Sequence, residues 1–179
     1  MSSNCGKLCW GSVDTRFGRV FAAASSDGIV AVTLPREAPT TFHKRLKEQA
    51  KKFARGLEIC EQPSTILNAA LSQIVQYFEG TRREFKIPID LRATPFTKKV
   101  LLNLTNIRFG DYKTYGELAK AIGSPRASRA VGLALSKNPI PIILPCHRIV
   151  ASNGIGGFAG KTRQIDLKRE MLRLEGIDI

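Results

Sequence analysis

The first third of the chain places short, β-favouring apolar runs between turn residues. Three such runs occupy residues 8–13, 18–24 and 28–34, with Asp, Gly and Ser between them. This pattern predicts strands joined by tight turns in an antiparallel meander. Residues 86–90 are predicted to add one more short strand.

Two stretches between these strands have helical character. Residues 40–55 form a strongly basic helical candidate, which we interpret as a solvated helix face. Residues 64–80 carry apolar side chains at intervals of three and four, the pattern of an amphipathic helix. Residues 88–93 are interpreted as a passage between domains, which predicts one domain over 1–93 and a second over 94–179.

The second domain is predicted to begin with a capped helix. Thr94 is a suitable N-cap, and Pro95 suits the first helical position. An apolar stripe predicts that this helix packs on a core, and its members are Phe96, Val100, Leu104 and Ile107.

A helix-turn-helix pattern follows over residues 115–122 and 125–137. Gly123 and Ser124 join the two helices, with Ser124 as the cap of the second helix and Pro125 as its first residue. One face of the second helix is predicted to be buried: Ala127, Ala130, Val131, Ala134 and Leu135. The other side is small and basic: Arg126, Ser128, Arg129, Gly132 and Ser136. Such a face can approach nucleic acid closely, although many helix pairs share it without binding anything.

The last part of the chain contains the candidate chemistry. Residues 138–150 combine three prolines with an apolar run that ends in Cys146 and His147, so a thiol and an imidazole lie in a stiff, buried segment. Neighbours in a strand point to opposite faces, so a working pair needs a turn or a bridging water. An isolated Cys-His pair is more often an inert cysteine beside an ordinary histidine. A glycine-rich loop at 154–160 and a final helix at 161–175, with Gly176 as its C-cap, complete the chain.

Composition and charge narrow the class of protein. The 179 residues are 43% hydrophobic, which supports a globular core, and no apolar run is long enough to span a bilayer. Without a signal-like N-terminus, we expect an intracellular protein, cytoplasmic in a prokaryote and nuclear in a eukaryote. The formal net charge of +13 favours a polyanionic partner, with nucleic acid as the first candidate. The part from residue 94 onward is the more basic, with 14 basic and 6 acidic residues against 14 and 9 before it.

The other cysteines suggest no cofactor. Cys5, Cys9 and Cys60 show no paired framework, so reduced thiols are expected. Together with His43 they could formally supply four zinc ligands, but the scattered spacing matches no compact zinc finger. We therefore predict neither a metal site nor a cofactor.

An ordered series of motifs resembles the O6-alkylguanine-DNA alkyltransferase family. The series consists of Thr94-Pro95-Phe96, residues 112–119, Arg129-Ala130-Val131-Gly132, Asn138-Pro139, Pro145-Cys146-His147-Arg148, Gly157-Phe158-Ala159-Gly160 and Leu174-Glu175-Gly176. The resemblance covers about the C-terminal half clearly. It implies an α/β (α+β) fold, with an RNase H-like N-terminal domain and a helical, winged helix-turn-helix C-terminal domain.

The resemblance also implies a reaction and its residues. An alkyl group would pass irreversibly from O6-alkylguanine, and less efficiently from O4-alkylthymine, in duplex DNA to Cys146, after extrusion of the damaged base. His147 would take the thiol proton through a water, and Glu175 would orient the imidazole. Tyr115 would act as a donor to the departing guanine. A thiolate is a soft nucleophile, and the thioether formed is not labile to water, so each molecule would act once.

Further residues take roles by the same resemblance. The DNA-binding residues would be Arg126, Ser128, Arg129, Ala130, Gly132 and Tyr115, with Arg129 replacing the extruded base in the stack. Asn138 would hold a turn and Arg148 would form a supporting ion pair. Val150, Phe158 and Ala159 would line the substrate pocket, and Phe158 stands where many members have tyrosine. The expected partner is double-stranded DNA containing alkylated bases, bound by a monomer.

Two other classes of function stay open at this point. A non-reactive relative would recognise alkylated bases without removing the group, but such proteins lack the acceptor cysteine that Cys146 supplies. A thiol hydrolase or redox protein would instead turn over many times on an ester, a peptide or a disulfide.

Overall fold

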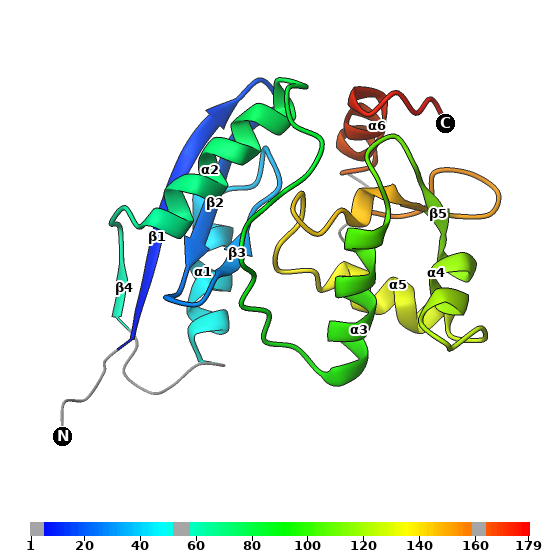
Figure 1. Ribbon diagram of the computed structural model, residues 1–179, viewed down its shortest axis with the longest axis horizontal. Helices are drawn as coiled ribbons and strands as arrows, with labels where there is room; N and C mark the ends of the chain where they lie inside the picture. The colour runs from blue at the N-terminus through cyan, green and yellow to red at the C-terminus, as the bar shows by residue number, and fades with distance from the viewer. Residues whose placement is uncertain (1–5, 52–57, 159–163) are drawn as a thin grey trace. The chain divides into compact units, whose positions relative to one another are not determined.

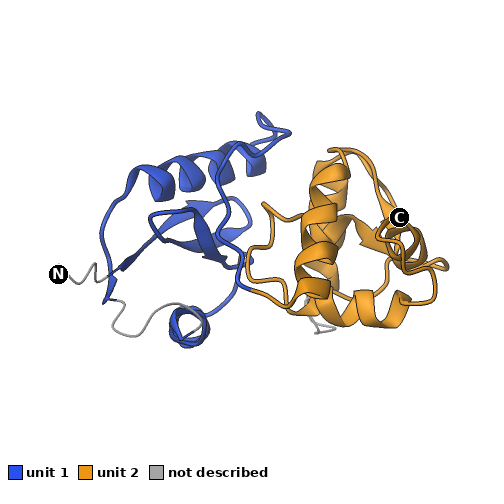
Figure 2. Ribbon diagram, turned by 60° about the horizontal axis from the view of Figure 1, so that its bottom comes forward, with its two compact units in different colours: residues 1–92 blue, residues 93–179 orange. Residues whose placement is uncertain are grey.

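The protein divides into two compact units in a computed structural model that describes residues 6–51, 58–158 and 164–179. Unit 1 covers Met1–Arg92 and unit 2 covers Ala93–Ile179 (Figure 2). The division falls one residue before the domain boundary expected from the sequence.

Unit 1 is a sheet covered by two helices (Figure 1). Its elements are β1 (Lys7–Thr15), β2 (Gly18–Ala24), β3 (Ile29–Val32), α1 (Pro39–Ala50), β4 (Glu58–Cys60) and α2 (Thr65–Phe78). The strand order is β3-β2-β1-β4. The first three strands form the predicted antiparallel meander, and β4 pairs in parallel with β1.

The two helices of unit 1 pack on opposite faces of the sheet. Leu8 of β1 belongs to a buried cluster with Phe42 and Leu46 of α1. Gly11, three residues along the same strand, instead faces Leu67 and Leu71 of α2. Side chains alternate between the faces of a strand, so α1 covers one face and α2 the other. Ser64 caps α2 by accepting a hydrogen bond from the Leu67 N–H.

The predicted strand at residues 86–90 is wrong. Only an isolated bridge joins Ile89 to Ile29 there. Pro88 has no N–H to donate, so this segment makes two backbone hydrogen bonds, Ile29 N to Pro88 O and Asp90 N to Ile29 O, and no longer ladder. The basic helix expected over residues 40–55 ends at Ala50, and residues 52–57 lie outside the described part of the chain.

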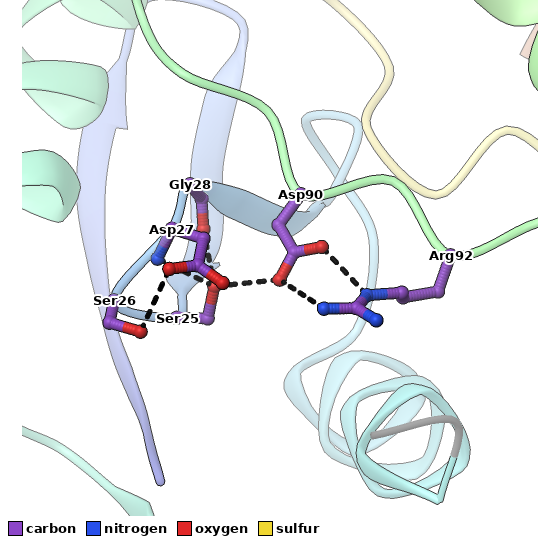
Figure 3. Close-up of polar contacts among 6 residues, drawn as sticks. All are labelled: Ser25, Ser26, Asp27, Gly28, Asp90 and Arg92. Atoms are coloured by element: carbon purple, nitrogen blue, oxygen red, sulfur yellow. Dashed lines mark hydrogen bonds and ion pairs between the residues drawn. The ribbon is translucent and has the colours of Figure 1, made fainter. Parts of the chain in front are cut away.

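A polar cluster fixes the end of unit 1 to the turn between β2 and β3 (Figure 3). The Ser25 hydroxyl donates to the Asp90 carboxylate at 2.9 Å, and Arg92 pairs with the same carboxylate at 2.8 Å. At Gly28 the backbone comes so close that an added Cβ would lie 2.7 Å from the Pro88 carbonyl oxygen. Only glycine fits there without a shift of the backbone.

In its described residues, unit 2 is mainly helical, with one two-stranded parallel sheet. Its elements are α3 (Pro95–Asn103), η1 (Leu104–Asn106), β5 (Lys113–Thr114), α4 (Tyr115–Ala121), α5 (Ser128–Ser136), η2 (Cys146–Arg148), β6 (Ile149–Val150) and α6 (Ile165–Leu174). The sheet pairs β5 with β6. Thr94 caps α3 through the Thr97 N–H, and Pro95 is the first helical residue, as predicted.

Three details of the predicted helices are wrong. Phe96 is 36% exposed because it lies in the first turn of α3, while Val100, Leu104 and Ile107 are buried as predicted. Helix α5 begins at Ser128 rather than at Pro125. Ser124 is used elsewhere: its N–H bonds to the Ala119 carbonyl at the end of α4, and its carbonyl accepts from Ala127 in a turn.

The third error concerns the face of α5. Ala127 and Ala130 were expected in the buried stripe, but Ala127 is half-buried and Ala130 is exposed, whereas Val131, Ala134 and Leu135 are buried. Because α5 lacks the predicted first turn, its buried face is formed by Val131, Ala134 and Leu135. No helix within the described ranges is long and apolar enough to cross a membrane.

Candidate functional site

The segment that precedes Cys146 is a buried, irregular turn. The Asn138 side chain spans it, donating to the Leu144 carbonyl at 2.9 Å and accepting from the Ile140 N–H at 3.0 Å. Ile142 has a φ of 75°, which is rare for a β-branched residue. The prolines and this left-handed residue keep the segment out of a sheet, and Asn138 replaces the missing ladder hydrogen bonds.

Cys146, His147 and Arg148 form the short 3₁₀ turn η2. The thiol residue is 8% exposed and His147 is fully buried. A 3₁₀ turn has about three residues per turn, so successive side chains point in different directions rather than to opposite faces. The turn that the sequence required for a thiol beside an imidazole is therefore present.

Glu175 connects His147 and Arg148. Its Oε1 lies 2.7 Å from His147 Nε2, and its two oxygens accept from Arg148 Nε at 2.8 Å and Nη2 at 3.0 Å. Arg148 also donates to the Ile107 carbonyl at 2.6 Å. Glu175, rather than Gly176 as expected from the sequence, is the C-cap of α6, and Gly176 follows with a φ of 83°. The helix therefore ends where its last carboxylate can reach η2.

The charges of this cluster follow from its burial. Burial alone would raise the pKa of Glu175, but hydrogen bonds and attraction from His147 and Arg148 outweigh it and bring the pKa to about 2. Burial lowers the pKa of His147, although Glu175 opposes this shift. A neutral imidazole that donates from Nε2 to a carboxylate keeps Nδ1 as its basic nitrogen. The arrangement suits a general base oriented by an acid.

The thiol needs such a base. Burial raises the pKa of Cys146, while a hydrogen bond from Asn138 and the positive charge of Lys168 act in the opposite direction. At neutral pH the sulfur is therefore mostly protonated, and nucleophilic attack requires that the proton be taken away.

Lys168 is a site residue that the sequence analysis missed. It is fully buried, and its Nζ donates to the carbonyls of Ile149 and Ile155 at 2.6 Å each and of Gly157 at 3.1 Å. Burial lowers its pKa to about 8, and the Cys146 thiolate partly offsets this effect. The signal was available, because Lys168 precedes Met171 and Leu172 by three and four residues on the apolar face of α6.

Tyr115 lies at the start of α4 and faces the same region. Its hydroxyl donates to the Gly157 carbonyl at 3.2 Å. Burial raises its pKa, and negative charge on Cys146 raises it further. A Cβ added at Gly132 of α5 would lie 3.6 Å from the tyrosine ring, so the small residue lets the two helices approach.

The remaining predicted residues lie on or near α5 and η2. Arg126, Arg129 and Ala130 are exposed, and Ser128 and Gly132 are half-buried. Leu133, which the sequence analysis did not single out, is 59% exposed on the same helix. Val150 and Phe158 are buried. Ala159 lies outside the described residues. Within the described part of the chain, no group of three or more His, Cys, Asp or Glu side chains could hold a metal ion.

The comparisons with known proteins agree with this geometry. Residues 8–91 match the family described as 6-O-methylguanine DNA methyltransferase, ribonuclease-like domain, and residues 95–177 match the DNA binding domain of the same family. A methylated-DNA–protein-cysteine methyltransferase of Bacillus subtilis is 34% identical over 167 residues, which is 93% of this chain and 94% of the relative. The chain belongs to the O6-methylguanine DNA methyltransferase family.

Other members support this assignment. A methylated-DNA–protein-cysteine methyltransferase of Methanosarcina acetivorans is 40% identical over 69% of this chain and 82% of its own length. The crystal structure of Mycobacterium tuberculosis OGT in complex with DNA covers 93% of this chain and 92% of its own, with 30% identity and a TM-score of 0.74. The methyltransferase of Pyrococcus kodakaraensis reaches a TM-score of 0.67 at 28% identity, over 95% of this chain and 99% of its own. The mixed α/β fold predicted from the sequence is confirmed by these structures.

Proposed function

We propose that this protein repairs duplex DNA by moving an alkyl group from O6 of guanine, and less efficiently from O4 of thymine, to the sulfur of Cys146. The observation that carries the proposal is the 2.7 Å contact between His147 and Glu175 immediately beside a buried cysteine. Family membership supplies the substrate class, since the relatives are named methylated-DNA–protein-cysteine methyltransferases.

The chemistry divides among the buried side chains. His147 Nδ1 takes the proton of the Cys146 thiol through a water, and Glu175 stabilises the imidazolium that forms. The thiolate then attacks the alkyl carbon, so a sulfur–carbon bond forms while the bond between that carbon and guanine O6 breaks. The electron pair of the broken bond leaves with guanine, and the Tyr115 hydroxyl donates a hydrogen bond to a ring nitrogen that gains charge.

The product explains why one molecule acts once. A thioether is not hydrolysed by water as a thioester is, and the reaction has no second step that restores the thiol. The absence of turnover separates this mechanism from that of a thiol hydrolase.

We assign DNA binding to α5 and to Arg126, which precedes it in the chain. Arg126 and Arg129 supply charge for phosphates, and exposed Ala130 and half-buried Gly132 leave room for the duplex backbone. Arg129 enters the base stack in place of the flipped nucleotide, which must leave the duplex because its O6 cannot otherwise reach a buried sulfur. Ser128 adds a hydroxyl contact at the start of the helix.

The pocket for the flipped base is formed beside η2. Val150 offers backbone groups to the base, and buried Phe158 supplies an apolar wall. Ala159 is assigned to the same pocket by the family resemblance alone, because it lies outside the described residues. Phenylalanine makes no hydroxyl contact, so selectivity for the alkyl group depends on shape at this position. We infer that the protein acts as a monomer, since one chain supplies every residue of the mechanism.

The first experiment is intact-mass analysis after the reduced protein is mixed with duplex DNA that carries O6-methylguanine. We expect the mass of one methyl group on each protein molecule, with no further increase on longer incubation. Trypsin cuts after Lys137 and Arg148, and the resulting peptide Asn138–Arg148 contains Cys146 as its single cysteine. The methyl group should be found in that peptide.

Two controls make the result decisive. Unmodified duplex should leave the mass unchanged, and Cys146→Ala should bind the damaged duplex without gaining mass. Lesion-selective binding of the wild-type protein without any mass change would identify a non-reactive recognition protein. Absence of both binding and transfer would overturn the proposal and favour a thiol hydrolase.

A further inference from the structure

Cys9 and Cys60 form a second thiol site, in unit 1 and independent of the proposed function. Cys9 lies in β1 and Cys60 in β4, and the two residues are direct partners in the parallel pairing of these strands. Their Sγ atoms are 3.8 Å apart, although 51 positions separate them in the sequence. The sheet, rather than local sequence, brings the thiols together.

The geometry of this pair suits a disulfide. Neighbouring strands lie about 4.7–4.9 Å apart, and disulfides span Cα distances of about 4.4–6.8 Å. Rotation of the two side chains can therefore close the gap between the sulfurs without moving the strands. An ion pair between Lys7 and Glu58, at 3.5 Å, links β1 and β4 close to the two cysteines. Both cysteines are half-buried, so a small oxidant can reach them.

We propose that Cys9 and Cys60 are a redox-active dithiol that closes to an intramolecular disulfide when the protein meets hydrogen peroxide. One thiol loses its proton, and the thiolate attacks a peroxide oxygen. The O–O bond breaks, the hydroxide that leaves takes up that proton to become water, and a sulfenic acid remains on the attacking sulfur. The second thiol then attacks that sulfur, the S–O bond breaks, and a second water departs as the S–S bond forms. Two thiols and one peroxide give one disulfide and two waters, and a dithiol reductant reverses the change.

The short distance between the two thiols favours the second step, in which one thiol attacks the sulfenic acid formed on the other. Burial raises the pKa of Cys60, and the Cys9 thiol adds to the effect, so the first attack on peroxide is not fast. Once a sulfenic acid exists, however, its partner already lies beside it and captures it before further oxidation. Cys146 is 8% exposed and burial raises its pKa, so the acceptor thiol is a poorer target for the same oxidant.

The test is peptide mapping under non-reducing conditions after treatment of the reduced full-length protein with one equivalent of hydrogen peroxide. Trypsin cuts after Lys7, Arg16, Arg55 and Arg82. Cys9 is then in the peptide Leu8–Arg16 and Cys60 in the peptide Gly56–Arg82, whereas Cys5 is in the peptide that ends at Lys7. We expect a species that links Leu8–Arg16 to Gly56–Arg82, and dithiothreitol should release both peptides.

Matched variants separate this pair from the other cysteines. Cys5→Ser should form the same linked species, and Cys9→Ser should not form it. Because the bond closes a long loop, the oxidised wild-type protein should melt roughly 5 °C or more above the reduced protein. A bond between Cys5 and Cys60, or irreversible oxidation of Cys9 and Cys60 without linkage, would overturn the proposal. Peroxide treatment should also leave methyl transfer to Cys146 intact.

Discussion

At the scale of single residues, the site depends on three buried charged side chains, those of Glu175, Arg148 and Lys168. Glu175 is ionised between His147 and Arg148, and Lys168 holds three carbonyls beside the sulfur. Each buried charge has partners, which is the condition for keeping charges out of water at an acceptable cost. Replacement of one member leaves its partners buried without compensation, so substitutions here should affect both the chemistry and the stability.

Lys168→Met should slow methyl transfer at pH 7. The ammonium lowers the pKa of Cys146, so its loss leaves a smaller fraction of thiolate, and a shift of one unit corresponds to about tenfold in rate. Single-turnover kinetics measured from pH 6 to pH 9 should show the loss shrinking as the pH rises. Arg173→Met, on the exposed side of α6, is the control and should behave as the wild-type protein. A deficit that is equal at every pH would indicate a structural role for Lys168 instead.

Glu175→Gln should change how stability depends on pH. The folded pKa of Glu175, about 2, lies below its value of 4.5 in an unfolded chain, so its contribution is fully present above pH 4.5 and is lost as the pH falls toward 2. Denaturant unfolding of the wild-type protein between pH 7 and pH 3 should show this loss, with a slope from this group of at most about 1.4 kcal/mol per pH unit. The variant should be less stable at pH 7 but should lose less stability below pH 4.5. If the stability of the two proteins fell in parallel as the pH decreased, the low pKa assigned to Glu175 would be wrong.

At the scale of elements, α5 is the part of unit 2 whose exposed side chains are most suited to a partner. Arg129 and Leu133 lie one turn apart, so charge and apolar surface share a face. An aliphatic side chain on such a face can wedge against sugars or between bases in the minor groove.

Leu133→Ala should weaken binding to damaged duplex DNA several-fold while leaving the fold unchanged. The lost contact is apolar, so the salt dependence of binding should stay the same, whereas Arg129→Ala should reduce it. Fluorescence anisotropy at several salt concentrations measures both properties. Leu102→Ala is a matched control, because Leu102 is 40% exposed on α3. Equal losses for the two leucine variants would show that Leu133 has no special contact with DNA.

The elements that the sequence predicted well are those with local signals. The predicted cap Thr94 satisfies an N–H group within its own first turn, and the strands of the meander follow from β-favouring runs between turn residues. The start of α5 was missed because the carbonyl and N–H of Ser124 are engaged by the end of α4 and by a turn. The place of Lys168 on the apolar face of α6 could be seen in the sequence, but the three distant carbonyls that allow its burial could not. Contacts of this kind follow from tertiary packing and have no signature in a short window.

At the scale of the whole molecule, the proposed reaction modifies only unit 2, which contains Cys146. The residues around Cys146 from Asn138 to Val150 are all buried. A methyl group on the sulfur must be accommodated among them, and an added carbon in a packed interior typically costs about 1–3 kcal/mol. Repair should therefore reduce the stability of the protein that performs it.

The methylated protein should melt at a lower temperature than the free protein. Differential scanning calorimetry of both forms, with the DNA removed, measures the change. Protein incubated with unmodified duplex and recovered in the same way is the control. Coincident melting curves would show that the pocket absorbs the methyl group without strain.

The short turn η2 has a consequence for how this chain can change over evolutionary time. Cys146, His147 and Arg148 are consecutive, and in the proposed mechanism their side chains serve separate purposes: nucleophile, base and ion pair. An inserted or deleted residue within the turn would rotate the side chains that follow by about a third of a revolution and misdirect them together. Substitutions in the preceding apolar run, by contrast, alter one packing contact at a time. Lineages that keep the activity should therefore vary in the composition of this segment while its length stays fixed.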